Sequence, residues 1–112
     1  MIGRRRIALA LALVAAWPAA GAQQAASDPV EAGRKIYVSS CQRCHGINLA
    51  ARGLGFDLRT FPQHDKERFR RSVTNGLRAM PAWGSTLKPE QLDLIWVYIG
   101  SVNGWKAGSG SP

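Results

Sequence analysis

The segment Cys41-Gln42-Arg43-Cys44-His45 places two thiols and one imidazole within five consecutive residues. Its C-x-x-C-H pattern is typical of covalent attachment of a c-type haem. Each thiol can form a thioether with one vinyl group of the same porphyrin, and the histidine that follows can bind the iron as its proximal ligand. We therefore predict that Cys41 and Cys44 bind haem c covalently and that His45 ligates its iron.

The chain is 112 residues long, which is enough for one domain. Hydrophobic residues make up 46% and charged residues 20%, a composition that excludes collagen, a low-complexity tail and a long coiled coil. Two cysteines are too few for the multiple disulfides that stabilise small secreted scaffolds. A domain of this size therefore needs a further source of core, and a buried haem can supply it.

Residues 1–22 have the pattern of a secretory signal peptide. Residues 4–6 are three arginines, residues 7–17 are apolar, and Ala20-Gly21-Ala22 is a small-residue cleavage site. The alternative is an uncleaved membrane anchor, but the apolar run is broken by Pro18 and is shorter than the roughly 20 residues of a spanning helix. We predict cleavage after residue 22 and export by the secretory route. The mature chain would keep 90 residues, and loss of the three arginines would lower the formal net charge from +8 to +5.

The cysteine motif has three alternative interpretations. A thioredoxin-like thiol pair needs a βαβ setting, and no part of the chain has the alternating pattern of a strand. A zinc site built from Cys41, Cys44 and His64 would have irregular ligand spacing, and the adjacent Cys44 and His45 would strain the geometry around one small ion. A local disulfide is the third alternative. The haem interpretation is favoured because it also accounts for the export signal and the small core.

Three segments have the pattern of helices, so the predicted fold class is all-α. Asp28 and Pro29 provide a cap and first residue for a helix that ends near Ser40. A second helix is capped by Asp65 and stops at Asn75-Gly76, where the chain can turn left-handed. The last helix begins at Pro89, and its apolar stripe consists of Leu92, Ile95, Tyr98, Ile99 and Val102.

The rest of the chain is predicted to be loop. Residues 46–62 contain apolar side chains without a sustained period, and we expect this loop to bury them: Leu49, Leu54, Phe56, Leu58 and Phe61. Residues 23–27 are predicted to be a flexible lead-in and residues 104–112 a flexible tail. The folded domain is accordingly placed at residues 28–103.

Met80 is the only methionine left once the leader is removed, and it is our candidate for the distal ligand of the haem iron. A thioether favours ferrous iron, so His/Met ligation raises the reduction potential and leaves no open coordination site. Pro81 holds the chain extended behind Met80, which favours a ligand in a loop over the alternative role of core filler. His64 is the competing ligand, but its position in a loop before a helix cap is typical of a solvated residue.

In their order along the chain, the leader, the 41–45 motif, Met80-Pro81 and the closing helix resemble the small monohaem class I cytochromes c of the bacterial periplasm. The resemblance spans about residues 28–103. It implies a cytochrome c-like fold with three or more helices and long loops around one covalently bound haem. It also implies that the first and last helices cross closely, with Gly33 and Tyr37 facing Tyr98.

A narrower resemblance concerns the electron donor. Residues 55–62, Gly-Phe-Asp-Leu-Arg-Thr-Phe-Pro, are followed by Arg68-Phe69 and by Met80-Pro81-Ala82-Trp83. Together they look like cytochromes that accept electrons from quinoprotein alcohol dehydrogenases. The resemblance implies such a dehydrogenase as donor and a terminal oxidase or another cytochrome as acceptor.

Two further residues are candidates for contact with the haem propionates. Arg59 lies in an otherwise apolar loop, where a buried guanidinium would need an anion, and Trp83 follows the predicted distal ligand. The alternative for Arg59 is a side chain that extends to solvent. Several basic residues could also steer an acidic partner to the haem, or could simply form a solvated face: Arg43, Arg52, Lys66, Arg68, Arg70, Arg71, Arg78 and Lys88.

These observations predict a monomeric periplasmic one-electron carrier rather than an enzyme. Nucleic-acid binding is disfavoured because the chain is exported and has no basic surface interleaved with aromatic residues. Stable membrane insertion is not expected once the leader is cleaved. The alternatives are a haem subunit of a dehydrogenase or oxidase complex and, with an open iron site, a peroxidase-like or gas-binding domain.

Overall fold

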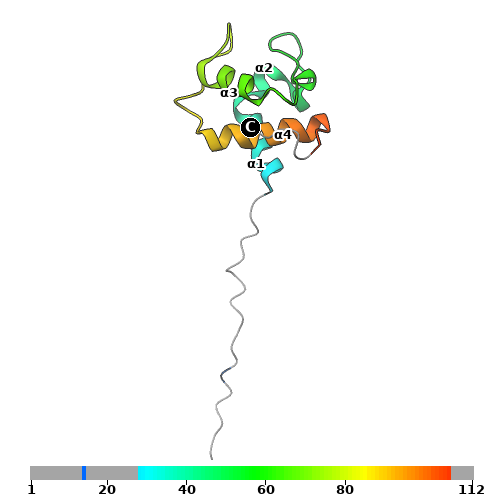
Figure 1. Cartoon of the computed structure of the whole chain (residues 1–112), viewed down its shortest axis with the longest axis vertical. Helices are drawn as coiled ribbons and strands as arrows, with labels where there is room; N and C mark the ends of the chain where they lie inside the picture. The colour runs from blue at the N-terminus through cyan, green and yellow to red at the C-terminus, as the bar shows by residue number, and fades with distance from the viewer. Residues whose placement is uncertain (1–13, 15–27, 107–112) are drawn as a thin grey trace, which may run out of the picture.

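The computed structural model describes residue 14 and residues 28–106, and its helices lie around one core (Figure 1). Their order is α1 (Pro29–Ser40), α2 (Gln42–His45), η1 (Ile47–Leu49), η2 (Leu58–Thr60), α3 (Lys66–Asn75) and α4 (Pro89–Asn103). The described residues contain no strand, only an isolated β-bridge. The predicted all-α fold is confirmed. The predicted leader, apart from residue 14, and all of the predicted lead-in at residues 23–27 lie outside the described residues.

The helices begin and end where the local sequence predicts. The Asp28 carboxylate accepts a hydrogen bond from the Val30 amide at 3.0 Å, and the Asp65 carboxylate accepts one from the Arg68 amide at 3.2 Å. Gly104 follows α4 with φ of 68°, a left-handed conformation that costs glycine little. Because each cap involves neighbours in the sequence, the three long helices could be placed without knowledge of the tertiary structure.

The closest packing in the fold is between α1 and α4, which cross in Figure 1. A Cβ atom added to Gly33 would lie 1.9 Å from the carbonyl oxygen of Leu94 and 3.0 Å from the Cβ atom of Tyr98. The rings of Tyr37 and Tyr98 pack one turn further on, with their centroids 5.1 Å apart. The predicted crossing is therefore confirmed, and it depends on the absence of a side chain at residue 33.

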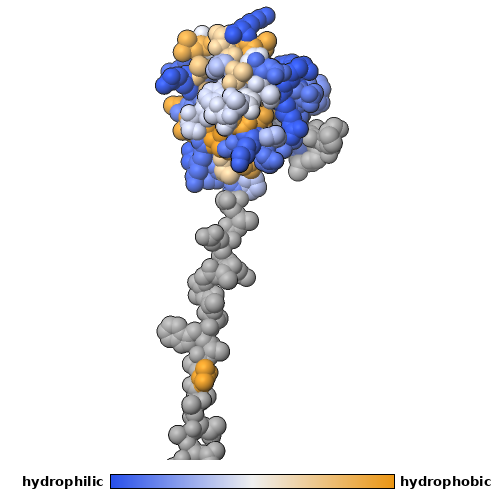
Figure 2. All heavy atoms as spheres, turned by 90° about the vertical axis from the view of Figure 1, so that its left-hand side faces the viewer, coloured by the Kyte–Doolittle hydropathy of each residue, from blue (hydrophilic) through white to orange (hydrophobic). Residues whose placement is uncertain are grey.

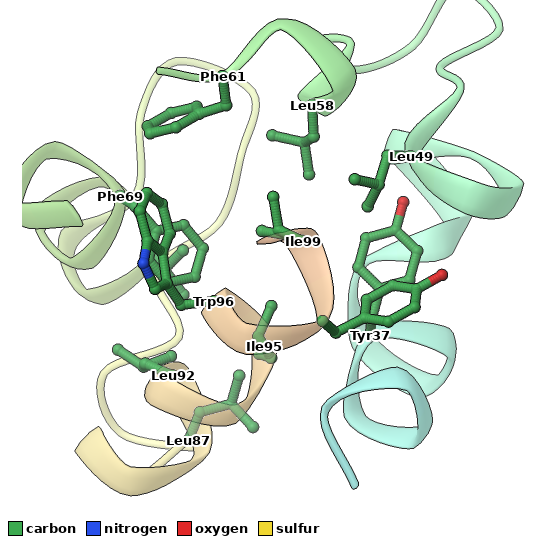
Figure 3. Packing of buried hydrophobic residues seen from close by; sticks show 12 residues of the cluster. Tyr37, Leu49, Leu58, Phe61, Phe69, Leu87, Leu92, Ile95, Trp96 and Ile99 are labelled. Atoms are coloured by element: carbon green, nitrogen blue, oxygen red, sulfur yellow. The ribbon is translucent and has the colours of Figure 1, made fainter. Parts of the chain in front are cut away.

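The core fills the space between this crossing, α3 and the loop after α2 (Figure 3). Trp96 belongs to its aromatic part, with ring centroids 5.8 Å from Phe61 and 5.1 Å from Phe69. The buried apolar side chains are Tyr37, Leu49, Leu58, Phe61, Phe69, Val73, Leu87, Leu92, Ile95, Trp96, Tyr98 and Ile99. Most of the predicted α4 stripe is thus buried, although Val102 is exposed.

The prediction that loop 46–62 buries its apolar side chains is only partly correct. Leu49, Leu58 and Phe61 are buried, but Leu54 is 79% exposed and Phe56 is 54% exposed. A loop without a period gives no local signal of which side chains face inward, so composition alone overestimated its burial. Figure 2 shows one face on which apolar side chains lie among hydrophilic ones.

Contacts continue beyond the domain boundary predicted at residue 103. The ring of Trp105 packs on Trp96 with centroids 4.5 Å apart, and an added Cβ atom at Gly100 would lie 2.9 Å from the Trp105 ring. The Gln63 side chain donates a hydrogen bond to the carbonyl of Lys106 at 3.0 Å. The folded unit therefore reaches at least residue 106, and residues 107–112 lie outside the described residues.

Ion pairs join α3 to α4 at the surface. The Asp93 carboxylate accepts from Arg70 at 2.6 Å and pairs with Lys66 at 3.1 Å. Partial burial alone would raise the pKa of Asp93, but the hydrogen bonds from Arg70 and Lys66 outweigh this effect and lower its pKa.

Across the described part of the chain, no helix combines the length and hydropathy needed to cross a bilayer.

Replacing Gly33 with alanine tests the helix crossing. Alanine favours the helix by up to about 1 kcal/mol, whereas overpacking costs about 1–3 kcal/mol or more. The added methyl would meet backbone atoms that cannot rotate away, so we expect the overpacking cost to exceed the gain in helix propensity. Gly33→Ala should therefore lower the free energy of unfolding by about 2 kcal/mol. Urea denaturation of the haem-loaded protein measures the change. Lys35→Ala, on the exposed side of the same helix, is the control, and equal stability of the two variants would contradict the prediction.

Candidate functional site

The motif residues follow directly from the end of α1. The amide of Cys41 donates to the carbonyl of Tyr37 at 2.8 Å, which ends α1, and the next residues form the short helix α2. The amide of His45 donates back to the carbonyl of Cys41 at 2.9 Å. Cys41 is partly buried against the core and Cys44 is exposed, and both thiols are free. The fold thus holds all three motif side chains on one turn of backbone.

The environment of Cys41 does not suit a reactive redox thiol. Burial, with a contribution from the charge of Cys44, raises the pKa of the Cys41 thiol to about 11. Reactive redox cysteines have lowered pKa values because the thiolate is their nucleophile. Among the described residues, no three His, Cys, Asp or Glu side chains are grouped so that they could hold a metal ion. The thioredoxin-like and zinc alternatives therefore gain no support from the geometry.

The imidazole of His45 is oriented by the loop before η2. Its Nδ1 atom lies 2.8 Å from the carbonyl oxygen of Phe56. A carbonyl can only accept, so Nδ1 must carry the proton, and the neutral ring then keeps its lone pair on Nε2. A fixed Nδ1–H with a backbone partner is the arrangement that orients metal-binding histidines and raises their basicity. His45 is therefore prepared to bind a metal through Nε2.

Gly55 allows this contact, although its residue type alone predicts no role in the site. A Cβ atom there would lie 2.6 Å from the carbonyl oxygen of Cys44 and 3.1 Å from Nδ1 of His45. The loop can therefore approach the motif only if residue 55 has no side chain. The glycines of this loop were visible in the sequence, but the pairing of residue 55 with residues 44 and 45 is a long-range contact that no local pattern reports.

A second contact fixes the end of the motif. The Tyr37 hydroxyl donates to the carbonyl of Gly46 at 2.6 Å, and burial raises the pKa of Tyr37 far above its ordinary value. Gly46 has φ of 84°, and a Cβ atom there would lie 2.0 Å from the carbonyl oxygen of Ala50. The hydrogen bond from the neutral Tyr37 hydroxyl therefore joins the turn after His45 to α1. The tight conformation of that turn requires glycine at residue 46.

Met80 lies in a tight turn after α3. The Met80 amide donates to the Leu77 carbonyl at 3.0 Å, and the Leu77 amide donates to the Met80 carbonyl at 3.1 Å. The Trp83 amide donates to the Val73 carbonyl of α3 at 2.8 Å, which fixes the chain on the other side. The side chains of Met80, Trp83 and Cys41 are all partly buried against the same core. The predicted distal ligand and one predicted attachment cysteine thus both pack against the same buried core.

Arg59 is not the buried cation that the apolar loop suggested. Its side chain is 57% exposed, and its guanidinium pairs with the carboxylate of Asp57 at 2.6 Å. Hydrogen bonds from Arg59 hold the pKa of Asp57 below its ordinary value. The anion that Arg59 binds is thus Asp57, only two residues away, and not the predicted haem propionate. His64, the competing iron ligand, is exposed in the turn before α3.

The basic residues fall into two groups. Carboxylates neutralise some of them, since Arg68 pairs with Asp65 at 3.6 Å while Lys66 and Arg70 share Asp93. The guanidinium of Arg68 also lies 4.5 Å from the ring centroid of Phe61. The others have no carboxylate within 4.0 Å in the described part of the chain: Lys35, Arg43, Arg52, Arg71, Arg78 and Lys88.

The residues present fit a c-type haem. Two free thiols and an imidazole with an available Nε2 lie within α2 and its N-cap, and a thioether packs on the same core as one of the thiols. Apolar side chains near these donors remain exposed and can cover a large apolar cofactor: Ile47, Leu54, Phe56 and Leu77. This donor set matches the soft and imidazole ligands that haem iron accepts.

Comparison with known proteins agrees with this chemistry. Residues 28–99 match the family described as cytochrome c oxidase, cbb3-type, subunit III. The chain is 38% identical over 72 residues to a cytochrome c6 of Gloeothece citriformis, covering 60% of this chain and 66% of that protein. It is 37% identical over 79 residues to a cytochrome c6 of Nostoc sp., covering 66% of this chain and 70% of that protein.

A third relative is much longer than this chain. The quinohemoprotein alcohol dehydrogenase ADH IIB of Pseudomonas putida is 35% identical over 78 residues, which are 67% of this chain and 11% of the dehydrogenase. The chain therefore spans about a tenth of that relative and about two thirds of the first cytochrome c6. No solved structure matches the chain. A family match that extends from the cap of α1 almost to the end of α4 means that the chain belongs to the small class I c-type cytochromes, which bind haem c covalently.

Proposed function

We propose that Cys41 and Cys44 hold the haem by thioethers and that His45 and Met80 are its axial ligands. The observation that carries the proposal is the 2.8 Å contact between Nδ1 of His45 and the Phe56 carbonyl. This contact leaves Nε2 as the only nitrogen of the ring that can bind iron. The turn that returns from Leu77 to Met80 supports the second ligand, because its two backbone hydrogen bonds fix the position of residue 80.

With these ligands the protein is a one-electron carrier. The haem supplies reversible one-electron redox chemistry, and His/Met ligation favours the ferrous state without an open site for a substrate. The chain's own residues hold the ligands in place and shield them from water. Trp83, partly buried against the core, is our candidate donor to a propionate. Arg59 is a weaker candidate because it would have to exchange its bond with Asp57.

We further propose that the carrier acts in the periplasm after removal of residues 1–22. Its donor would be a periplasmic quinoprotein alcohol dehydrogenase, and its acceptor a terminal oxidase or another cytochrome. The similarity to ADH IIB supports a donor of this class, because a domain like this chain forms part of that enzyme. The charge remaining after cleavage would keep the protein basic, which suits electrostatic attraction to acidic partners.

A second candidate is a haem subunit held permanently in a dehydrogenase or oxidase complex. The match to ADH IIB favours this candidate, because a segment similar to 67% of this chain makes up 11% of that enzyme and is permanently joined to it. The redox chemistry would be identical, and only the lifetime of the complex would differ. Co-purification of a dehydrogenase or oxidase with the tagged chain from its own cells would support the subunit, and isolation of the chain alone would support the free carrier.

Expression with export and haem attachment tests the proposal as a whole. We expect a mature protein that begins at Gln23 and keeps one haem after denaturation, because thioethers survive loss of the fold. Intact-mass spectrometry reports both the cleavage and the covalent haem. Cys41→Ala with Cys44→Ala is the matched variant and should lose all haem on denaturation. If the variant retained haem after denaturation, or if the natural chain released it, the proposed covalent attachment through Cys41 and Cys44 would be wrong.

Carbon monoxide binding tests the distal ligand. The ferrous natural protein should resist carbon monoxide because Met80 occupies the sixth position, whereas Met80→Ala should bind it rapidly. We also expect Met80→Ala to lower the reduction potential by on the order of 0.1 V, well within the roughly 0.8 V that axial ligands span. His64→Ala is the control and should match the natural protein. Rapid binding by the natural protein would instead indicate the peroxidase-like or gas-binding alternative.

Alanine substitutions of the two glycines in the loop before η2, Gly53 and Gly55, test how His45 is positioned. Gly55→Ala should push Phe56 away from Nδ1, reduce the basicity of the imidazole and so raise the reduction potential, with a loss of about 1–3 kcal/mol in stability. Gly53→Ala is the control, because residue 53 has φ of 95° but no atom within 4 Å of an added Cβ. Backbone strain should destabilise that variant by about 1–2 kcal/mol without changing the potential. If Gly55→Ala and Gly53→Ala had equal reduction potentials, Gly55 would have no role in positioning His45.

A further inference from the structure

The loop that orients His45 is held from its other side by the end of α4. The Asn103 side chain donates a hydrogen bond from Nδ2 to the carbonyl of Leu58 at 3.0 Å, across 45 residues of sequence. Leu58 begins η2, which packs on α4, and its own side chain is buried near Ile99 (Figure 3). Phe56, whose carbonyl contacts Nδ1 of His45, lies only two residues earlier. One short segment of loop therefore joins α4 to the proposed iron ligand.

The segment from Phe56 to Leu58 is bonded too tightly to absorb a displacement. The Asp57 carboxylate accepts hydrogen bonds from the Arg59 amide at 3.0 Å and from the Arg59 guanidinium at 2.6 Å. The Leu58 carbonyl also accepts a hydrogen bond from the Phe61 amide at 3.2 Å, which closes the turn of η2. Because these local bonds fix the turn, a movement of Leu58 would carry the Phe56 carbonyl with it.

The carboxamide of Asn103 is not needed to end the helix. Gly104 ends α4 in a left-handed conformation, and the amides of Gly104 and Trp105 both donate to the Gly100 carbonyl. Backbone groups thus satisfy this helix end by themselves. The Asn103 side chain is partly buried, and its donor reaches the distant loop instead of a neighbour in the helix. This arrangement suits a side chain that holds the loop in place.

A row of aromatic rings runs from the same end of α4 to Phe56. The ring centroids of Trp105 and Trp96 lie 4.5 Å apart, and those of Trp96 and Phe61 lie 5.8 Å apart. The centroids of Phe61 and Phe56 follow at 6.4 Å. The last two pairs meet edge to face, a favourable arrangement for aromatic rings. The residue whose carbonyl orients His45 is therefore supported by packing that ends on Trp105.

We propose that Asn103 is a positioning residue for the proposed iron ligand. By holding Leu58, it keeps the Phe56 carbonyl on Nδ1 of His45. Gly55 lets the loop approach the motif, and Asn103 prevents it from moving away. The inference rests on the proposed function, because this contact can affect the iron only if His45 is its ligand. A hydrogen bond to Nδ1 makes the imidazole more basic and so favours ferric iron, and loss of the bond raises the reduction potential.

The alternative role for Asn103 is stability alone. Loss of a partly buried hydrogen bond lowers the free energy of unfolding wherever the bond lies, and this change by itself leaves the imidazole of His45 as it was. Two other measurements therefore decide between the roles. They are the reduction potential of the haem-loaded protein and the rate at which the Nδ1 proton of His45 exchanges with water.

Substitutions of Asn103 in the ¹⁵N-labelled, haem-loaded ferrous protein test the positioning role by nuclear magnetic resonance and redox titration. Asn103→Leu keeps the size of the side chain and removes the donor, and Asn103→Asp replaces the donor with an acceptor of the same shape. We expect both variants to accelerate exchange of the His45 Nδ1 proton about fivefold, the effect of one lost hydrogen bond, and to raise the reduction potential. Asn103→Gln keeps a donor and should resemble the natural protein more closely. Trp105→Leu should act in the same direction as Asn103→Leu.

Ser101→Ala is the matched control. The Ser101 hydroxyl donates to the Tyr98 carbonyl at 2.8 Å, so the variant loses a hydrogen bond at the same end of α4 without touching the loop. It should leave both the reduction potential and the exchange of the His45 proton unchanged. Residue 103 is partly exposed at the end of α4, so its variants keep the buried core. If Asn103→Leu and Asn103→Asp matched Ser101→Ala in both measurements, Asn103 would have a structural role only and the proposal would be wrong.

The carbon-bound ring protons of His45 distinguish this inference from the proposed function. In the ferrous protein, the ring current of the haem shifts these protons strongly upfield if His45 is the iron ligand. If the shift is absent while exchange of the Nδ1 proton still responds to Asn103→Leu, the proposed ligand is wrong, although Asn103 does position His45. If the shift is present and Asn103→Leu changes neither the exchange nor the reduction potential, the proposed ligand stands and the positioning role of Asn103 is wrong.

Discussion

The carbonyl oxygen of Leu94 lies so close to Gly33 that no side chain fits between α1 and α4. This contact fixes how closely α1 crosses α4, and the predicted haem attachment motif follows α1 directly. The tilted rings of Tyr37 and Tyr98 extend the crossing toward the motif, and the Tyr37 hydroxyl donates to the Gly46 carbonyl in the turn after it. The position of the site thus depends on how tightly two helices far apart in the sequence can pack.

Backbone groups hold both of the proposed iron ligands in position. The imidazole of His45 is held by a carbonyl, and Met80 is held by the reciprocal amide and carbonyl bonds of a tight turn. Such partners do not depend on the identity of the side chains that surround them. They require instead that two loops come close, which Gly55 allows on the His45 side. Preorganised ligands of this kind change little on electron transfer, which suits a carrier.

The basic side chains of this small domain fall into two groups, those paired with a carboxylate of the same chain and those without one in the described residues. Carboxylates within the same chain pair with several cations of α3 and with the arginine of η2, as Asp93 and Asp57 do for Arg70 and Arg59. With 15 basic and 7 acidic residues in the whole chain, many cations must lack an internal partner. Arg43 and Arg52, in and after the motif, have no carboxylate within 4.0 Å in the described part of the chain, whereas surface pairs elsewhere contribute little to stability.

The amino-acid sequence by itself determined the helices and the donor set, because caps, apolar stripes and the C-x-x-C-H motif are all local patterns. It could not determine which loop side chains are buried, so Leu54 and Phe56 were misplaced and Arg59 was assigned an anion other than Asp57. Only the tertiary structure brought the Phe56 carbonyl to His45 and the Asn103 side chain to the Leu58 carbonyl. These contacts join residues whose spacing follows no period, and so they exist only once the helices have packed.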